Sequence, residues 1–215
     1  MISNYVKIKS LGFASHVRVS RVVGLCIFLM ISGCGGSSNV QIAADFPMLI
    51  TKPIELKAAL VLESNFSNYI ATPNKTTTID IGAGQKQVWK NTFTGLVSDA
   101  TFLDSIEFVD ESHDLIVVPS VVDVQVSVPS DNYLSIYEVW IKYNIDIRSS
   151  NGDNLDNWYM PVYGKTANAS WSKNRAIGSA TEMALRDVGA KLSLDFFRIP
   201  SVQRYLKNRA LEASQ

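Results

Sequence analysis

The chain of 215 residues is poor in thiols and imidazoles, with only two cysteines and two histidines. Cys26 and Cys34 lie near its beginning, and only His113 follows them. Structural zinc sites and disulfides need at least two such side chains placed together. The sequence after Cys34 therefore excludes a disulfide, a cysteine nucleophile and a zinc site made of cysteine and histidine.

His113 stands in the acidic segment "DESHDL", beside Asp110, Glu111 and Asp114. These side chains could form a metal site or a general base, but no second histidine or free cysteine completes a ligand set. We therefore predict a solvated turn at this segment and no metal.

An excess of basic charge is also missing, since 20 Lys and Arg balance 20 Asp and Glu. Residues 1–33 contain four of the basic residues and no acid, so the remainder holds 16 basic and 20 acidic residues. Proteins that bind nucleic acid usually carry a basic stripe that neutralises phosphates. We therefore expect no nucleic-acid partner.

Long apolar runs are absent as well. Val22–Ser32 is an apolar stretch of eleven residues, shorter than the roughly 20 needed to cross a bilayer. Basic residues precede it and small residues follow it, which is the order of a secretory signal peptide. The sequence therefore predicts a removable leader over residues 1–33.

The end of this leader, Ile31-Ser32-Gly33-Cys34, resembles the lipobox of bacterial lipoproteins. The resemblance implies that signal peptidase recognises Ile31, Ser32 and Gly33. It also implies that Cys34 carries diacylglycerol on its sulfur and an acyl chain on its new amine. Several acyl chains anchor a protein durably, and we expect no cofactor besides these lipids. A plain signal peptide with an incidental cysteine and an uncleaved anchor are the alternatives.

Gly35 follows the cysteine. In enterobacterial lipoproteins an aspartate at this position favours retention in the inner membrane, so glycine implies the inner leaflet of the outer membrane, facing the periplasm. Gly/Ser residues then predict a flexible tether over residues 34–46. A single periplasmic domain is expected over 47–215.

The centre of that domain has the strongest strand signal. Over residues 137–148, Tyr, Val and Ile alternate with polar residues and Trp140, and Val122, Val124, Val126 and Val128 alternate in the preceding segment. Such alternation is typical of strands with one buried face. From a predicted N-cap at Ser172, the apolar period becomes helical. We predict an α+β fold, a mainly antiparallel sheet with two or three helices packed on one face.

Catalytic motifs are not found. Gly164-Lys165-Thr166 resembles the end of a phosphate-binding loop, but position 159 is tyrosine where that loop needs glycine. A G-x-S-x-G nucleophile motif is also missing. We predict that the protein is not an enzyme; a hydrolase that uses loop carboxylates is the weaker alternative.

Aromatic residues on the last two strands form the remaining candidate site. Trp140 interrupts the polar face of its strand, and Trp158 and Tyr159 lie on the next one. An exposed aromatic patch would indicate a surface for a partner. If the C-terminal helices cover this face, the same rings belong to the core.

The second half of the chain resembles small bacterial outer-membrane lipoproteins in its pattern of elements. The strands "VVDVQVSV" and "YEVWIKYNIDIRSSNGD", the return strand ending "YGKTANASWS" and the helix "AIGSATEMALRDVGAKLSLDF" are similar to YajG-type lipoproteins. They are also similar to the LPS-assembly lipoprotein LptE and the auxiliary lipoproteins of ABC-type transport. The resemblance implies a non-enzymatic accessory in the cell envelope, held to the membrane by its lipid and bound to an envelope protein or a lipid. A subunit of a flagellar, pilus or secretion machine is the alternative.

Overall fold

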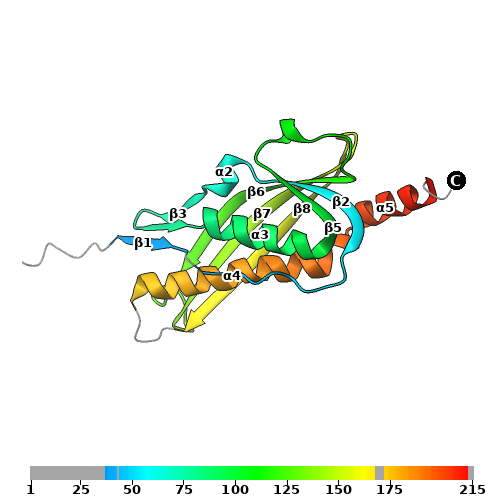
Figure 1. Cartoon of the computed structure of the whole chain (residues 1–215). Coiled ribbons are helices and arrows are strands. Elements are labelled where there is room, and N and C mark those ends of the chain that lie inside the picture. Colours follow the sequence, from blue (N-terminus) through cyan, green and yellow to red (C-terminus); the bar gives the residue numbers. More distant parts are fainter. Residues whose placement is uncertain (1–36, 43, 168–171, 213–215) are drawn as a thin grey trace, which may run out of the picture. The chain divides into compact units, whose positions relative to one another are not determined.

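The computed structural model describes residues 37–42, 44–167 and 172–212 (Figure 1). The strands are β1 Ser38–Gln41, β2 Ile54–Val61, β3 Ile70–Asn74, β4 Thr77–Asp80, β5 Val97–Leu103, β6 Leu115–Ser127, β7 Ile136–Ser149 and β8 Asn154–Ala167. The helices are α2 Ser64–Ser67, α3 Gly82–Leu96, α4 Lys173–Asp195 and α5 Pro200–Glu212, with short 3-10 turns at Ile106–Phe108 and Phe196–Arg198.

Two sheets organise these elements. The larger has the strand order β5-β2-β6-β7-β8, and the smaller has the order β1-β4-β3. β6, β7 and β8 run antiparallel, whereas β2 is parallel to both β5 and β6. Helices α3 and α4 lie side by side across one face of the larger sheet (Figure 1). The predicted α+β fold is confirmed, and its sheet is mixed because a helical connection joins β2 to β5.

Strand β7 follows the predicted alternation. Its odd-numbered residues from 139 to 149 are buried and its even-numbered residues from 138 to 148 are half-buried. β7 pairs with β6 on one side and β8 on the other, so its buried face lies at the middle of the core beneath the helices. We call this the inner face of the sheet, and the opposite one the outer face.

Strand β6 departs from the simple alternation at one point. The pairing with β7 shifts between Val121 and Asp123, which leaves Val122 as the extra residue of a β-bulge. A bulge reverses the side-chain phase along the strand. Val124 is consequently buried while Val122 is 56% exposed. Placing Val122 on the same face as Val124 was wrong for this reason.

Helix α4 follows the prediction closely. Ser172 is its N-cap, and the Ser172 hydroxyl accepts a hydrogen bond from the Arg175 amide at 3.4 Å. The apolar stripe predicted for this helix is buried throughout: Ile177, Ala180, Ala184, Leu185, Val188 and Leu192. A stripe of this width anchors the helix across the inner face of β7 and β8.

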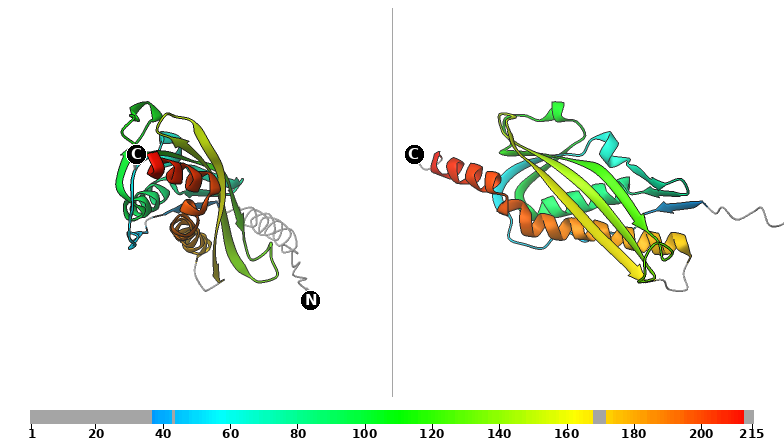
Figure 2. Two further views of the ribbon diagram at one scale, coloured as in Figure 1. Left: turned by 90° about the vertical axis from the view of Figure 1, so that its right-hand side faces the viewer. Right: turned by 180° about the vertical axis from the view of Figure 1, so that it is seen from behind.

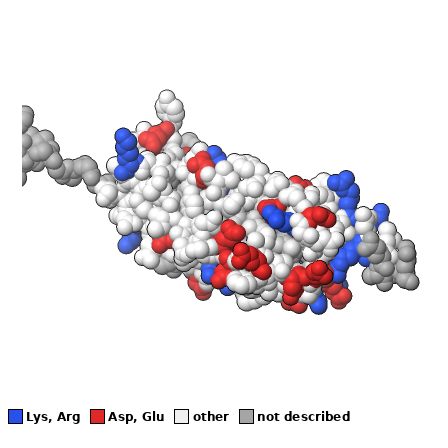
Figure 3. Space-filling view, turned by 90° about the horizontal axis from the view of Figure 1, so that it is seen from above, with Lys and Arg blue, Asp and Glu red and all other residues white. Residues whose placement is uncertain are grey.

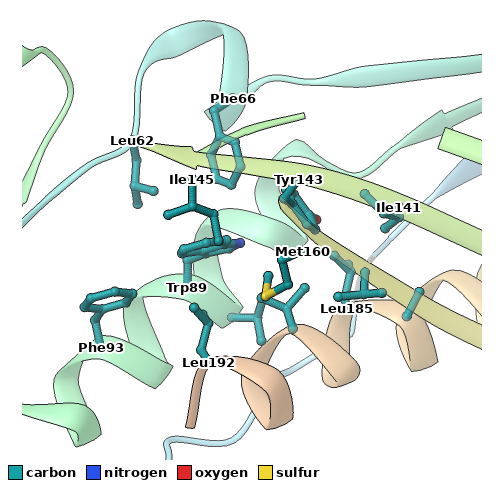
Figure 4. Close-up of a cluster of buried hydrophobic side chains, with 14 of the residues drawn as sticks. Leu62, Phe66, Trp89, Phe93, Ile141, Tyr143, Ile145, Met160, Leu185 and Leu192 are labelled. Atoms are coloured by element: carbon teal, nitrogen blue, oxygen red, sulfur yellow. The ribbon is translucent and has the colours of Figure 1, made fainter. Parts of the chain in front are cut away.

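The core between the sheet and the two helices is rich in aromatic rings (Figure 4). Trp89 of α3 stands edge-on to Tyr143 of β7, with ring centroids 5.8 Å apart, and stacks on Phe93 at 6.1 Å. The buried Tyr143 hydroxyl donates to Gln85 Oε1 at 3.1 Å. Gln85 in turn donates to the backbone carbonyl of Phe66. This chain of hydrogen bonds satisfies polar groups that would otherwise be buried without partners.

The domain begins earlier than the sequence indicates. Residues 38–41, expected within a flexible tether, form β1 and pair in parallel with β4. Phe46, from the same predicted tether, is 1% exposed, and its carbonyl accepts a hydrogen bond from Asn91 of α3. The tether prediction for 34–46 was therefore wrong from Ser38 onward, because its scattered apolar residues fill the space beside α3 and α4.

The close packing of α4 on β8 generates a test of stability. Gly164 lies beneath α4, where an added Cβ would overlap the helix backbone at Ala180 and Ala184. We expect Gly164→Ala to lower the free energy of unfolding by about 3 kcal/mol, because the helix must move away from the sheet. Urea denaturation of the purified protein measures the change.

Gly178→Ala in α4 is the matched control. Its Cβ would meet Val40 Cγ1 at 3.4 Å, which is an ordinary contact. Alanine also favours the helix by about 1 kcal/mol over glycine. Equal destabilisation by both substitutions would contradict the role given to Gly164.

Candidate functional site

The outer face of β6, β7 and β8 is the face that neither α3 nor α4 covers. Trp140, Lys142 and Asn144 point to it from β7, opposite the buried residues of that strand. The register places Tyr163 of β8 beside Trp140, and Tyr159 beside Asn144. The alternative that the C-terminal helices cover Trp140 was wrong, because α4 packs on the opposite face.

Trp140 and Tyr163 form an aromatic pair on this face. Their ring centroids are 5.2 Å apart with the planes tilted by 39°, and both side chains are half-buried. The Tyr163 hydroxyl donates to Glu138 Oε1 at 2.7 Å. Desolvation, together with this hydrogen bond to a carboxylate, raises the pKa of Tyr163 to about 12. Tyr163 therefore stays a neutral donor at physiological pH.

A charged pair lies next to these rings. Lys142 Nζ is 2.9 Å from Asp123 Oδ2, and the same oxygen accepts a hydrogen bond from Gln125 Nε2 at 2.7 Å. The hydrogen bond from Lys142 lowers the pKa of Asp123. Tyr159 of β8, which stands opposite Asn144 on the same face, is 51% exposed. The outer face thus offers aromatic surface bordered by fixed charges and donors, a composition typical of protein-binding surfaces.

Trp158 does not belong to this surface. It pairs with Ile145 on the inner face, and its ring centroid lies 6.5 Å from that of Phe196 beside the core. Because neighbouring residues of a strand point to opposite faces, Trp158 and Tyr159 cannot share one. The proposed surface of Trp140, Trp158 and Tyr159 is therefore corrected: the structure brings Trp140 and Tyr159 to one face and adds Tyr163.

The free edge of β8 is partly closed by α4. Asp187 accepts a hydrogen bond from the Tyr163 backbone amide at 3.1 Å, and Lys191 donates to the Pro161 carbonyl at 2.5 Å. Pro161 has no amide hydrogen to offer a further strand. Proline within a sheet is confined to edge strands and bulges, which agrees with the place of β8 at the edge of the larger sheet.

The segment "DESHDL" is a solvated turn only in its first half: residues 110–112 are exposed, but the two residues that follow are buried. His113 and Asp114 are each 8% exposed, and His113 Nδ1 lies 2.9 Å from Asp110 Oδ1. Asp114 Oδ2 accepts from the Lys57 amide at 2.9 Å, while Oδ1 pairs with Arg209 of α5 at 2.5 Å. Asp114 therefore joins β2 to α5 as a hydrogen-bond acceptor.

Charge on the rest of the surface is mixed. Acidic and basic side chains are interspersed over the face seen in Figure 3, and basic groups gather toward the end that carries α5. Within the residues that the structure describes, no three His, Cys, Asp or Glu side chains form a metal-binding group. No helix of the same residues is long and apolar enough to span a membrane.

Four predicted residues lie outside the described part of the chain: Ile31, Ser32, Gly33 and Cys34. The lipidation and signal-peptidase predictions made for them therefore stay predictions.

Several solved bacterial structures resemble this fold. A "putative neuraminyllactose-binding hemagglutinin homolog" from Helicobacter pylori has a TM-score of 0.53 and 12% identity, covering 80% of this chain and 100% of its own. A minor lipoprotein from Acinetobacter baumannii has a TM-score of 0.43 and 11% identity, covering 71% of this chain and 95% of its own. A "putative lipoprotein" from Caulobacter crescentus has a TM-score of 0.38 and 12% identity, covering 60% and 84%.

No family model and no curated protein matches the sequence. At 12% identity, the Helicobacter pylori structure shows a shared fold alone.

The Asp114 contacts lead to a second test. The substitution Asp114→Asn replaces one carboxylate oxygen by an NH2 group, which must point at either the Lys57 backbone amide or the Arg209 guanidinium. Two hydrogen-bond donors then face each other. We expect the free energy of unfolding to fall by about 2 kcal/mol, the scale of a buried hydrogen bond left unmade. Urea denaturation measures it, with Asp99→Asn on the exposed part of β5 as the control. A result equal to that control would contradict the role of Asp114.

Proposed function

We propose that the protein is a lipid-anchored bacterial envelope protein that acts as a non-enzymatic binding or assembly module in the periplasm. One observation supports the lipid anchor: a basic segment is followed by a short apolar run and then by Ile31-Ser32-Gly33-Cys34. Gly35 favours the outer membrane over the inner one. The mature chain then begins at the lipidated Cys34, four residues before β1.

The outer face supports a binding role for the domain. Half-buried Trp140 and Tyr163, with exposed Tyr159 beside the Lys142–Asp123 pair, form a surface fitted to a protein partner. Aromatic residues of this kind contribute strongly to binding when a partner excludes water from them. The YajG and LptE resemblance favours a role in lipid or LPS transport or outer-membrane assembly. An accessory subunit of a flagellar, pilus or secretion machine is the second candidate.

Cys34→Ser tests the anchor. In a Gram-negative host, labelling with radioactive palmitate should be lost in this variant, because serine offers no sulfur for the diacylglycerol. Cys26→Ser is the matched control and should keep the label, since Cys26 belongs to the leader that is removed. Label retained by Cys34→Ser would refute the lipoprotein assignment.

A photo-crosslinking amino acid at Tyr159 tests the binding face. In intact cells it should yield discrete crosslinked bands with an envelope protein, identified by mass spectrometry. Trp140→Ala in the same chain should weaken those bands severalfold, because it removes the neighbouring aromatic contact. The same probe at exposed Thr94 on α3 is the control. Identical bands from both positions would exclude a specific outer-face partner.

A further inference from the structure

The loop between β6 and β7, residues 128–135, has two neighbouring large apolar side chains that are exposed to solvent. Tyr133 is fully exposed, and the neighbouring Leu134 is 73% exposed. Exposure of two such large side chains at one loop tip leaves apolar surface in water. A surface that covered these two side chains would remove their apolar area from water.

One side chain links the two ends of this loop by hydrogen bonds. Asn132 Nδ2 lies within hydrogen-bond distance of three oxygens that share its two hydrogens: Ser127 Oγ at 2.9 Å, the Val128 carbonyl at 3.0 Å and the Ile136 carbonyl at 2.8 Å. Its Oδ1 accepts from the Ile136 amide at 3.2 Å. Asn132 thus closes the loop across its base and fixes the tip that follows it.

The loop also holds an unfavourable backbone conformation. Ser135 has a φ of 52°, the one non-glycine residue with positive φ in the described part of the chain. Residues with a Cβ adopt this region at a cost in free energy, and such strain concentrates at binding sites. Together with the Asn132 contacts, it indicates a loop shaped to present Tyr133 and Leu134.

The loop lies at the end of the domain where the described chain begins. Ile136, just after the loop, pairs with Ala167 at the end of β8, shortly before α4 starts. Asn174 of α4 donates to the Asn39 carbonyl of β1 at 3.3 Å. In Figures 1 and 2 the β6–β7 loop, the start of β1 and the start of α4 lie at one end, opposite α5.

Three exposed basic side chains lie at the same end. Lys75 lies in the β3–β4 turn beside the start of β1, because the Ser38 amide donates to the Thr76 carbonyl at 2.6 Å. Lys165 near the end of β8 and Arg175 at the start of α4 are exposed as well. Two acids lie beside them: Asp131 of the loop accepts from the Val128 amide at 3.2 Å, and Glu138 stands opposite Lys165 in the register of β7 and β8.

The chain between anchor and domain is short. Three residues, 35–37, separate Cys34 from Ser38, so the chain takes four steps of at most about 3.6 Å each between them. If Cys34 carries lipid, the start of β1 lies within about 14 Å of the bilayer surface. The end with the apolar tip and the basic residues is therefore the end of the domain tethered nearest to the headgroups.

We infer that this end is a bilayer-docking surface, in which Tyr133 and Leu134 enter the interface and Lys75, Lys165 and Arg175 contact anionic headgroups. The inference rests on the proposed lipidation of Cys34. Tyrosine favours the headgroup region, and basic residues near a membrane are attracted to anionic lipid. The fixed loop lets the tip enter without an ordering cost.

An environment-sensitive fluorophore on Ser130→Cys tests the docking. The lipidated full-length protein is reconstituted into vesicles of phosphatidylethanolamine and phosphatidylglycerol; lipid on Cys34 leaves the introduced cysteine as the free thiol. We expect a blue-shifted, brighter emission at position 130, and a water-like emission from the same label on Asn208→Cys in α5. Replacing both Tyr133 and Leu134 by serine should abolish the blue shift.

The outcomes separate this inference from the anchor. Protein that floats with the vesicles while position 130 stays water-like overturns the docking surface and leaves the anchor standing. Protein that does not float refutes the anchor itself. A blue shift that survives the double serine substitution, or that needs added envelope proteins, also overturns the inference. Vesicles of phosphatidylcholine alone should give a smaller shift, because they lack anionic headgroups.

Discussion

The burial of one face of β7 is the constraint on which the rest of the domain depends. Val139, Ile141, Tyr143, Ile145 and Ile147 are all fully buried, and only a layer laid across that face can keep water from them. Helices α3 and α4 form this layer, and their width is enough to cover β8 and part of β2 as well. Both long helices are thereby committed to a single side of the sheet.

That commitment leaves the opposite face available for other contacts. Among the described residues, side-chain pairs within the sheet stabilise the outer face: the Trp140–Tyr163 rings, the Tyr163–Glu138 hydrogen bond and the Lys142–Asp123 ion pair. Cross-strand pairs of this kind each contribute modestly, roughly 0.2–1 kcal/mol. The outer face is therefore ordered without being closed, and a partner would meet a surface already in place.

Periodicity carried most of what the sequence could reveal about the fold. The alternation of β7 and the stripe of α4 are long enough to stand out, and both hold in the structure. Features that depend on one residue of pairing register did not stand out: the bulge at Val122 and the opposite orientations of Trp158 and Tyr159. Contacts between distant segments were likewise invisible. Asp114 looks like a loop acid until Arg209 and the Lys57 amide are seen beside it, and Phe46 looks like tether until α3 is placed.

The side chains of α4 that close the edge of β8 have a consequence for the speed of association. A strand from another chain could pair at Tyr163 and Pro161 only after Asp187 and Lys191 had released their backbone partners. Strand addition at this edge would thus pass through an activation barrier set by two hydrogen bonds, one of them from a charged ammonium. At high protein concentration, such a kinetic barrier protects the folded chain from edge-to-edge polymerisation.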